Sequence, residues 1–152
     1  MHATRRQDGA VMVEFALVLV PLLLLVLGIL QFGLMLNAKI DQTHLTRDGA
    51  RYAAVNQNPG GGGGSLQSYI LAKADTADLA TNGIVCVSYP TNSATGTSGK
   101  VGDPVRVTMT YTYNLLPFMS ARMGVPAAVP INASATMRLE ALPTNNAAGC
   151  TT

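Results

Sequence analysis

The hydrophobic positions of this chain are concentrated in one long run near the N-terminus. Between Ala10 and Leu36 the only strongly polar side chains are Glu14 and Gln31, and residues 15–30 contain none. Because a helix rises about 1.5 Å per residue, roughly 20 apolar residues cross the ~30 Å hydrocarbon core of a bilayer. A helix that is apolar on every side is also unusual in a soluble domain of this size. The pattern therefore predicts a membrane-spanning helix at residues 10–36.

After this run the pattern becomes amphipathic, and no helix-breaking residue intervenes. Ala38, Leu45 and Tyr52 recur at intervals of seven, while charged residues such as Asp41 fill the remaining positions. This spacing is typical of a helix that buries one face. We expect one helix of about 45 residues that continues to residue 56 and is followed by a glycine-rich linker at residues 59–65.

The remainder of the chain predicts one short helix and three strands. Residues 66–80 have apolar side chains at helical spacing, and residues 84–89 form a β-rich run that ends at a proline. Residues 105–113 and 131–140 alternate between apolar and polar side chains, as half-buried strands do. The side chains predicted to face inward on these two strands are Val105, Val107, Met109, Tyr111, Tyr113, Ile131, Ala133, Ala135, Met137 and Leu139.

Three strands with one apolar face need a cover, and the amphipathic half of the long helix supplies one. The predicted fold class is therefore α+β, with a long N-terminal helix packed on a small antiparallel sheet and one short helix. Residues 66–140 would hold the short helix and the strands, and residues 141–152 would be a polar tail.

The predicted domain organisation has three parts. Residues 1–9 form a short basic leader, residues 10–36 the span, and residues 37–152 one domain outside the cytoplasm. Arg5 and Arg6 in the leader outweigh Asp8, and basic residues beside a span tend to stay cytoplasmic. A secretory signal peptide is the competing interpretation, but its apolar core would be shorter and would end at a small-residue cleavage site. We therefore expect the span to remain attached.

Two residues of the apolar run, Glu14 and Pro21, are unfavourable in a membrane-spanning helix. An ionised carboxylate such as Glu14 costs about 3 kcal/mol at mid-bilayer, and less near the interface. A cut between Gly9 and Ala10 would create a positive α-amine four residues before Glu14, on the same helix face. Pro21 removes one backbone hydrogen bond in mid-helix and predicts a kink.

The N-terminal pattern resembles a class III prepilin signal, which has a basic leader, a glycine and an apolar helix with a glutamate at its fifth mature position. The string GAVMVEFALVLVPLLLLVLGILQFG, followed by RDGARYAA at residues 47–54, resembles the TadE-like minor pilins (pseudopilins) of tight-adherence, or Tad/Flp, pilus systems. The resemblance covers residues 1 to about 55 and implies a pilin-like fold. Because major fibre subunits of these systems are short, the sizeable outer domain implies a minor component.

The resemblance also implies a site and a set of partners. Cleavage by a prepilin peptidase would fall after Gly9, and Glu14 and Pro21 would act in assembly. The implied location is the bacterial inner membrane, with the N-terminus in the cytoplasm. The implied partners are other pilin or pseudopilin subunits, the peptidase and the Tad assembly platform, and the implied roles are pilus assembly, secretion and adhesion.

Composition argues against nucleic-acid binding and against catalysis. The formal charge is only +2 and the basic residues are scattered, so no basic surface for a phosphate backbone is expected. His44 has no neighbours at metal-ligand spacing, and Asp75 and Asp78 lack a third carboxylate or a histidine nearby. We expect neither an enzyme nor a bound cofactor or metal.

The two cysteines, Cys86 and Cys150, both follow the apolar run. In an exported domain such a pair tends to form a disulfide, which would tie the C-terminus to the domain. The alternative is two unpaired small apolar residues.

A second hypothesis for the whole chain is an unprocessed single-span envelope protein whose outer domain binds a partner. It explains the span and the domain, but it leaves Gly9 and Glu14 without a role.

Overall fold

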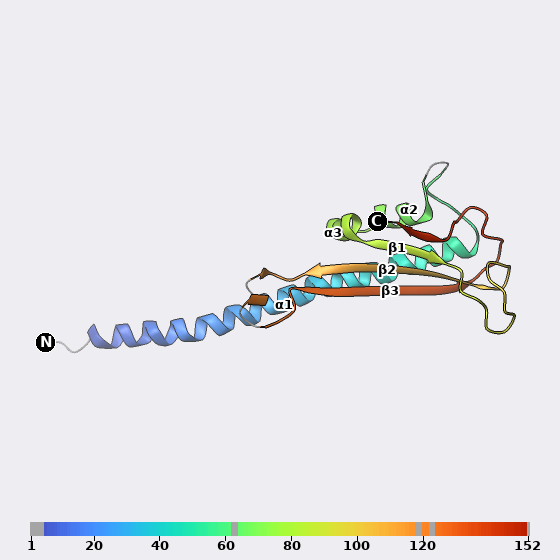
Figure 1. The fold of residues 1–152 in the computed structure, drawn as a ribbon. Coiled ribbons are helices and arrows are strands. Elements are labelled where there is room, and N and C mark those ends of the chain that lie inside the picture. Colours follow the sequence, from blue (N-terminus) through green and yellow to red (C-terminus); the bar gives the residue numbers. More distant parts are fainter. Residues whose placement is uncertain (1–4, 62–63, 118–119, 122–123, 152) are drawn as a thin grey trace. The chain divides into compact units, whose positions relative to one another are not determined.

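A computed structural model of the protein describes residues 5–61, 64–117, 120–121 and 124–151. In chain order the elements are α1 (Arg5–Ala54), α2 (Leu66–Ala72), α3 (Ala77–Asn82), β1 (Ile84–Ser88), β2 (Pro104–Asn114), β3 (Ala128–Arg138) and β4 (Gly149–Thr151) (Figure 1). The chain divides into two compact units, residues 1–36 and residues 37–152. The predicted α+β class is confirmed, with four strands and two short helices in place of three strands and one.

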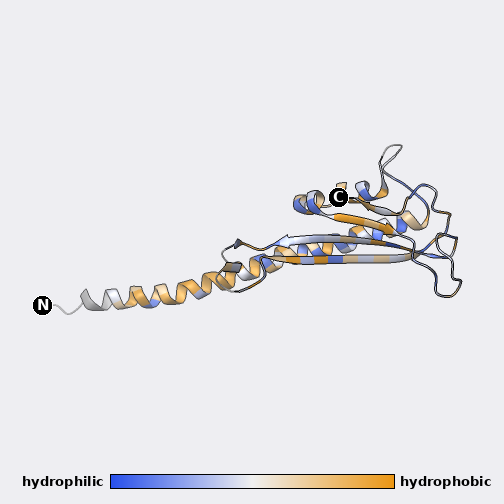
Figure 2. Ribbon diagram, in the orientation of Figure 1, coloured by the Kyte–Doolittle hydropathy of each residue, from blue (hydrophilic) through white to orange (hydrophobic). Residues whose placement is uncertain are grey.

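The first unit consists of the first part of α1, whose apolar side chains are exposed. Phe15, Leu17 and Ile29 keep 65%, 73% and 64% of their surface accessible. Figure 2 colours this part of the helix as hydrophobic almost throughout, and α1 continues through Pro21. Among the described residues, α1 is the one helix long and apolar enough to cross a membrane. A surface of this kind is stable only when lipid or other helices cover it.

The sheet of the second unit is antiparallel throughout, in the order β3-β2-β1-β4. Its central strand β2 pairs with β3 along its whole length, from Pro104 opposite Arg138 to Asn114 opposite Ala128. On one face Val105, Val107 and Met109 are completely buried, as their alternation predicts. This face is the core of the unit.

Residues 37–54 of α1 pack on that core through small side chains. A Cβ atom built at Gly49 would lie 2.4 Å from Ile70 Cδ1 of α2 and 3.4 Å from Val107 Cγ1 of β2. A side chain at this position would have to displace the end of Ile70, so glycine permits the close approach. The buried alanines along the same stripe are likewise small. The buried positions of this segment are Ala38, Asp41, Gln42, Leu45, Thr46, Gly49, Ala50, Ala53 and Ala54.

The prediction for this helix face was wrong at one important position. Asp41 was expected in solvent, yet it is only 9% exposed. Its Oδ2 accepts hydrogen bonds from the backbone N–H groups of Asp75 at 3.0 Å and Thr76 at 3.4 Å. Thr76 is the N-cap of α3 and makes no side-chain cap of its own. The carboxylate of α1 therefore caps a second helix, which compensates for its burial.

The predicted helix at residues 66–80 is divided into α2 and α3. Helix α2 begins with a reciprocal capping box between Ser65 and Ser68 and ends at Ala72. Helix α3 begins at Ala77, directly after the two residues whose backbone N–H groups donate hydrogen bonds to Asp41. The division allows both short helices to bury apolar residues against the sheet: Leu66, Ile70 and Leu71 from α2, and Leu79 from α3.

The bounds of β3 differ from the predicted strand at residues 131–140. Strand β3 begins at Ala128, within the stretch predicted as a connector, and tolerates Pro130 because it is an edge strand. Met137 was predicted to face the core but is 36% exposed, because it borders a hollow beside the end of α1.

The C-terminal segment, predicted as a tail, is part of the fold. Strand β4 pairs with β1, and Cys86 of β1 lies opposite Cys150 of β4, to which it is joined by a disulfide. Asn146 is 2% exposed, and its backbone oxygen accepts a hydrogen bond from Tyr89 Oη at 2.6 Å. The segment before β4 is thus held by polar contacts as well as by the covalent bond.

Replacing Asp41 with alanine should destabilise the outer unit, because two backbone N–H groups would lose their acceptor. We expect the free energy of unfolding to fall by about 1–3 kcal/mol. All five tyrosines lie between residues 52 and 113 and the chain has no tryptophan, so tyrosine fluorescence of the full chain in uncharged detergent reports this unit alone. Urea unfolding would be followed in this way.

Two variants serve as controls for Asp41→Ala. His44→Ala removes an exposed side chain one turn away and should change stability little. Asp41→Asn keeps an acceptor oxygen and should lose less than the alanine variant. Equal stabilities of Asp41→Ala and His44→Ala would show that the cap contributes nothing.

Candidate functional site

The sequence-predicted assembly residues lie together at the start of α1. Gly9, Ala10, Glu14 and Pro21 all belong to this helix and are exposed. Ala10 and Glu14 are four residues apart, so they lie one turn apart on the same helix face. Among the residues whose side chains are described, Glu14 has no hydrogen-bond or ion-pair partner. Its carboxylate is therefore available to a group on another molecule.

The fold itself does not require a glycine at position 9. A Cβ atom built there would meet nothing within 4 Å, and Gly9 lies in the helix rather than in a turn. Glycine also lowers helix stability relative to alanine. The packing of the fold therefore gives no reason for a glycine here. The same holds for Gly28 and Gly33, whose surroundings are also open.

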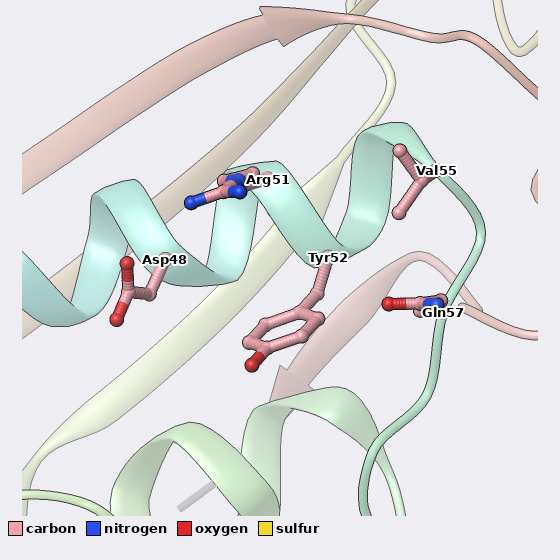
Figure 3. A pocket seen from close by; sticks show the side chains of 5 residues that line it. All are labelled: Asp48, Arg51, Tyr52, Val55 and Gln57. Atoms are coloured by element: carbon pink, nitrogen blue, oxygen red, sulfur yellow. The ribbon is translucent and has the colours of Figure 1, made fainter.

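A second candidate site is a hollow of about 470 Å³ beside the last turns of α1 (Figure 3). It is lined by Asp48, Arg51, Tyr52, Val55 and Gln57. The ring of Tyr52 packs edge-on against that of Tyr69 on α2, with ring centres 5.9 Å apart. This hollow combines an aromatic ring with one acid and one base on neighbouring helix turns.

Next to Tyr52, the side chain of Lys73 lies over the ring of Tyr69. Lys73 Nζ lies 5.0 Å from the centre of the Tyr69 ring. Hydrogen bonding with Lys73 lowers the pKa of the Tyr69 hydroxyl, and the same bond raises the pKa of Lys73. Lys73 is exposed and Tyr69 is half-buried, so the contact is a surface interaction of modest strength.

The candidate acid pair, Asp78 on α3 and Asp75 just before it, has a structural role. Asp78 accepts hydrogen bonds from the side chains of Asn82 and Tyr111, whereas Asp75 contributes its backbone N–H to Asp41. Burial raises the pKa of the Tyr111 hydroxyl, and the bond to Asp78 adds to this effect. Within the described residues, no three His, Cys, Asp or Glu side chains gather as a metal site.

Sequence reasoning missed Asp103, which organises the loop between β1 and β2. It is 2% exposed and accepts hydrogen bonds from Asn92, Thr95, Thr97 and the backbone N–H of Lys100, at 2.9–3.3 Å. Burial alone would raise the pKa of this carboxyl, but the hydrogen bonds outweigh burial and lower it. The signal was an aspartate between a glycine and a proline in a loop rich in hydroxyl groups.

Comparison with known proteins gives one finding, which concerns most of α1. The model of the TadE-like protein family matches residues 9–51. No curated protein and no solved structure gives a match to this chain. The matched residues include the exposed apolar helix, Glu14 and the buried Gly49 contact. Through residues 9–51, therefore, this chain is similar to the TadE-like proteins.

Proposed function

We propose that this protein is a minor pilin, or pseudopilin, of a Tad/Flp-type pilus. It would be inserted in the inner membrane, trimmed after Gly9 by a prepilin peptidase, and incorporated into the pilus to act in its assembly, secretion and adhesion. The observation that carries the proposal is the TadE-like match over an apolar helix that contains Gly9 and Glu14. Residues 1–9 would be the leader, residues 10–36 the span and assembly helix, and residues 37–152 the periplasmic or extracellular domain.

The orientation follows from charge. Arg5 and Arg6 precede the apolar run, and basic residues of this kind keep the N-terminus in the cytoplasm. The outer unit, with its disulfide between Cys86 and Cys150, would then lie in an oxidising compartment.

The apolar helix supports assembly because it can change its surroundings at low cost. Lipid tails and leucine side chains are similarly apolar, so exchanging lipid for neighbouring helices is nearly neutral in hydrophobic energy. Association must therefore be directed by specific contacts. Gly28 and Gly33 leave room for a close neighbour, and Glu14 supplies the charge.

Glu14 would set the register of the assembly. After cleavage the α-amine of Ala10 in one subunit would pair with the carboxylate of Glu14 in a neighbour. Both charges are costly away from water unless they are paired. This electrostatic role needs no cofactor and no catalytic activity of the protein itself.

Cleavage is the first expected outcome. Protein extracted from cells with an active prepilin peptidase should begin at Ala10, as read by N-terminal sequencing. Gly9→Leu should block the cut because a bulky side chain replaces a hydrogen atom, whereas Gly9→Ala should permit partial cutting. Gly28→Leu makes the same change at another open helix position and should leave cleavage intact. Wild-type protein that begins at Met1 would support the unprocessed envelope anchor instead.

Replacing Glu14 should leave insertion into the membrane intact and reduce incorporation into the pilus. Glu14→Ala makes the segment more apolar, so the amount in the membrane fraction should not fall. Leaving the partner amine unpaired costs about 3–5 kcal/mol, which corresponds to a loss of about a hundredfold or more in incorporation. The measurement compares membrane fractions with sheared filaments. Met12→Ala, at an exposed position two residues away, should behave as wild type. Equal incorporation of Glu14→Ala and Met12→Ala would remove Glu14 from the assembly role.

The oxidation state of the two cysteines tests whether the outer unit is exported. In protein recovered from cells, Cys86 and Cys150 should resist alkylation until a reductant is added. Cys150→Ser should lower the stability of the outer unit by about 2–5 kcal/mol, the usual cost of losing a native disulfide from a small secreted domain. Urea unfolding followed by tyrosine fluorescence measures this, with Ser93→Ala as a surface control. Free alkylation of both thiols without reductant would contradict the proposed location.

A further inference from the structure

One face of the sheet in the outer unit is not covered by any described helix. The helices α2 and α3 and residues 37–54 of α1 all contact the opposite face, which holds Val107 and Met109. The open face carries the alternate side chains of β2 and β3, all of them exposed or half-buried. They are mostly hydroxyl or amide groups with an arginine on each strand: Arg106, Thr108, Thr110, Thr112, Asn132, Ser134, Thr136 and Arg138.

The two arginines converge at one end of this face. Arg106 is paired with Thr136, and Arg138 is paired with Pro104, so the arginines are diagonal neighbours on the same face. Diagonal Cβ atoms lie about 7–8 Å apart, which lets two long side chains reach one ligand group. Both arginines line a hollow of about 290 Å³, together with Thr91, Asn92 and Ser93 of the adjoining loop.

Within the described residues, neither arginine forms an ion pair with an acid. Arg106 Nε donates to the neutral Thr136 Oγ1 at 3.3 Å, and within the described residues the Arg138 side chain has no hydrogen bond or ion pair. Asp103, the only acid in the loop at residues 89–103, is buried and already bound by its own loop. Glu140 borders a neighbouring hollow, which Arg138 also lines.

We propose that this hollow binds the carboxylate of an acidic oligosaccharide, with the sugar hydroxyls lying along the open face. Paired guanidinium groups offer forked donors that fit the two oxygens of a carboxylate. Threonine, serine and asparagine side chains both donate and accept hydrogen bonds, as a neutral sugar ring requires.

Other anionic polymers fit this surface less well. A nucleic acid would need a longer track of cations along its phosphates, and aromatic rings for stacking if it were single-stranded. The open face of β2 and β3 has two arginines and no aromatic side chain at its alternate positions. Two cations beside a row of hydroxyl groups match a ligand with isolated charges and many hydroxyls.

The position of the hollow within the outer unit makes it accessible to a large ligand. Gln42, near the start of the unit, contacts Ile131 of β3, whereas the backbone of Glu140 binds Ala54 at the other end of the helix. From Ile131 to Arg138 the strand advances seven residue steps, or about 23 Å. The hollow therefore lies at the end of the sheet away from Asn37. The proposal depends only on the outer unit and is independent of processing or pilus incorporation.

The test uses the full chain in uncharged detergent at low ionic strength, titrated with trigalacturonate by isothermal calorimetry. Wild-type protein should show saturable binding that weakens as salt is added. Arg106→Gln and Arg138→Gln should each weaken it about tenfold, since each removes charge-assisted hydrogen bonds. Neutral galactotriose should bind at least tenfold more weakly than trigalacturonate.

Two comparisons make the test decisive. Arg47→Gln changes the net charge equally at an exposed site on α1 and should leave binding within twofold. Unfolding followed by tyrosine fluorescence checks that each variant is folded. The proposal is overturned if trigalacturonate does not bind, if Arg47→Gln weakens binding as much as Arg138→Gln, or if inorganic phosphate at equal concentration displaces the sugar.

Discussion

The outer unit depends on the close approach of one helix to the sheet at Gly49. At this position α1, α2 and β2 meet within the distance that a single additional carbon would occupy. Because Ala38, Ala50 and Ala53 are also buried along the same stripe, the helix lies close to the strands over several turns. Cores packed at this density resist even small increases in volume.

The same helix also protects an exposed edge of the sheet. Lys39 donates to the backbone oxygen of Asn132, and Gln42 Nε2 donates to that of Ile131 at 3.2 Å, both on the edge strand β3. Edge strands expose unpaired backbone groups that attract other chains. Polar side chains at buried helix positions thus satisfy part of that edge, which explains why the covering helix is not uniformly apolar.

The parts of the structure that could be predicted from sequence are those with a sustained pattern. The alternation from Val105 to Tyr113 predicted β2, and the apolar run predicted the first part of α1. The position of Asp41 was predicted wrongly because a periodicity argument assigns charged side chains to the solvent-facing side of a helix. It cannot show that the backbone N–H of Asp75, 34 residues later, needs a hydrogen-bond acceptor. Strand β4 has three residues and no pattern of its own. Gly9 and Glu14 could be recognised as candidates from their motif and from the cost of a carboxylate in an apolar run, but within the described residues no side chain pairs with Glu14 to show its role.

The pairing of β4 with β1 has a consequence for the order in which the outer unit can form. Residues 149–151 supply the last strand, and Cys150 reaches back across 64 residues to Cys86. In a chain that is synthesised N-terminus first, the outer edge of β1 has no neighbour until residues 149–151 have been made. Completion of the sheet is therefore a late step that involves contacts distant in sequence, which form slowly. Until residues 149–151 pair with β1, this edge would need shielding from neighbouring chains.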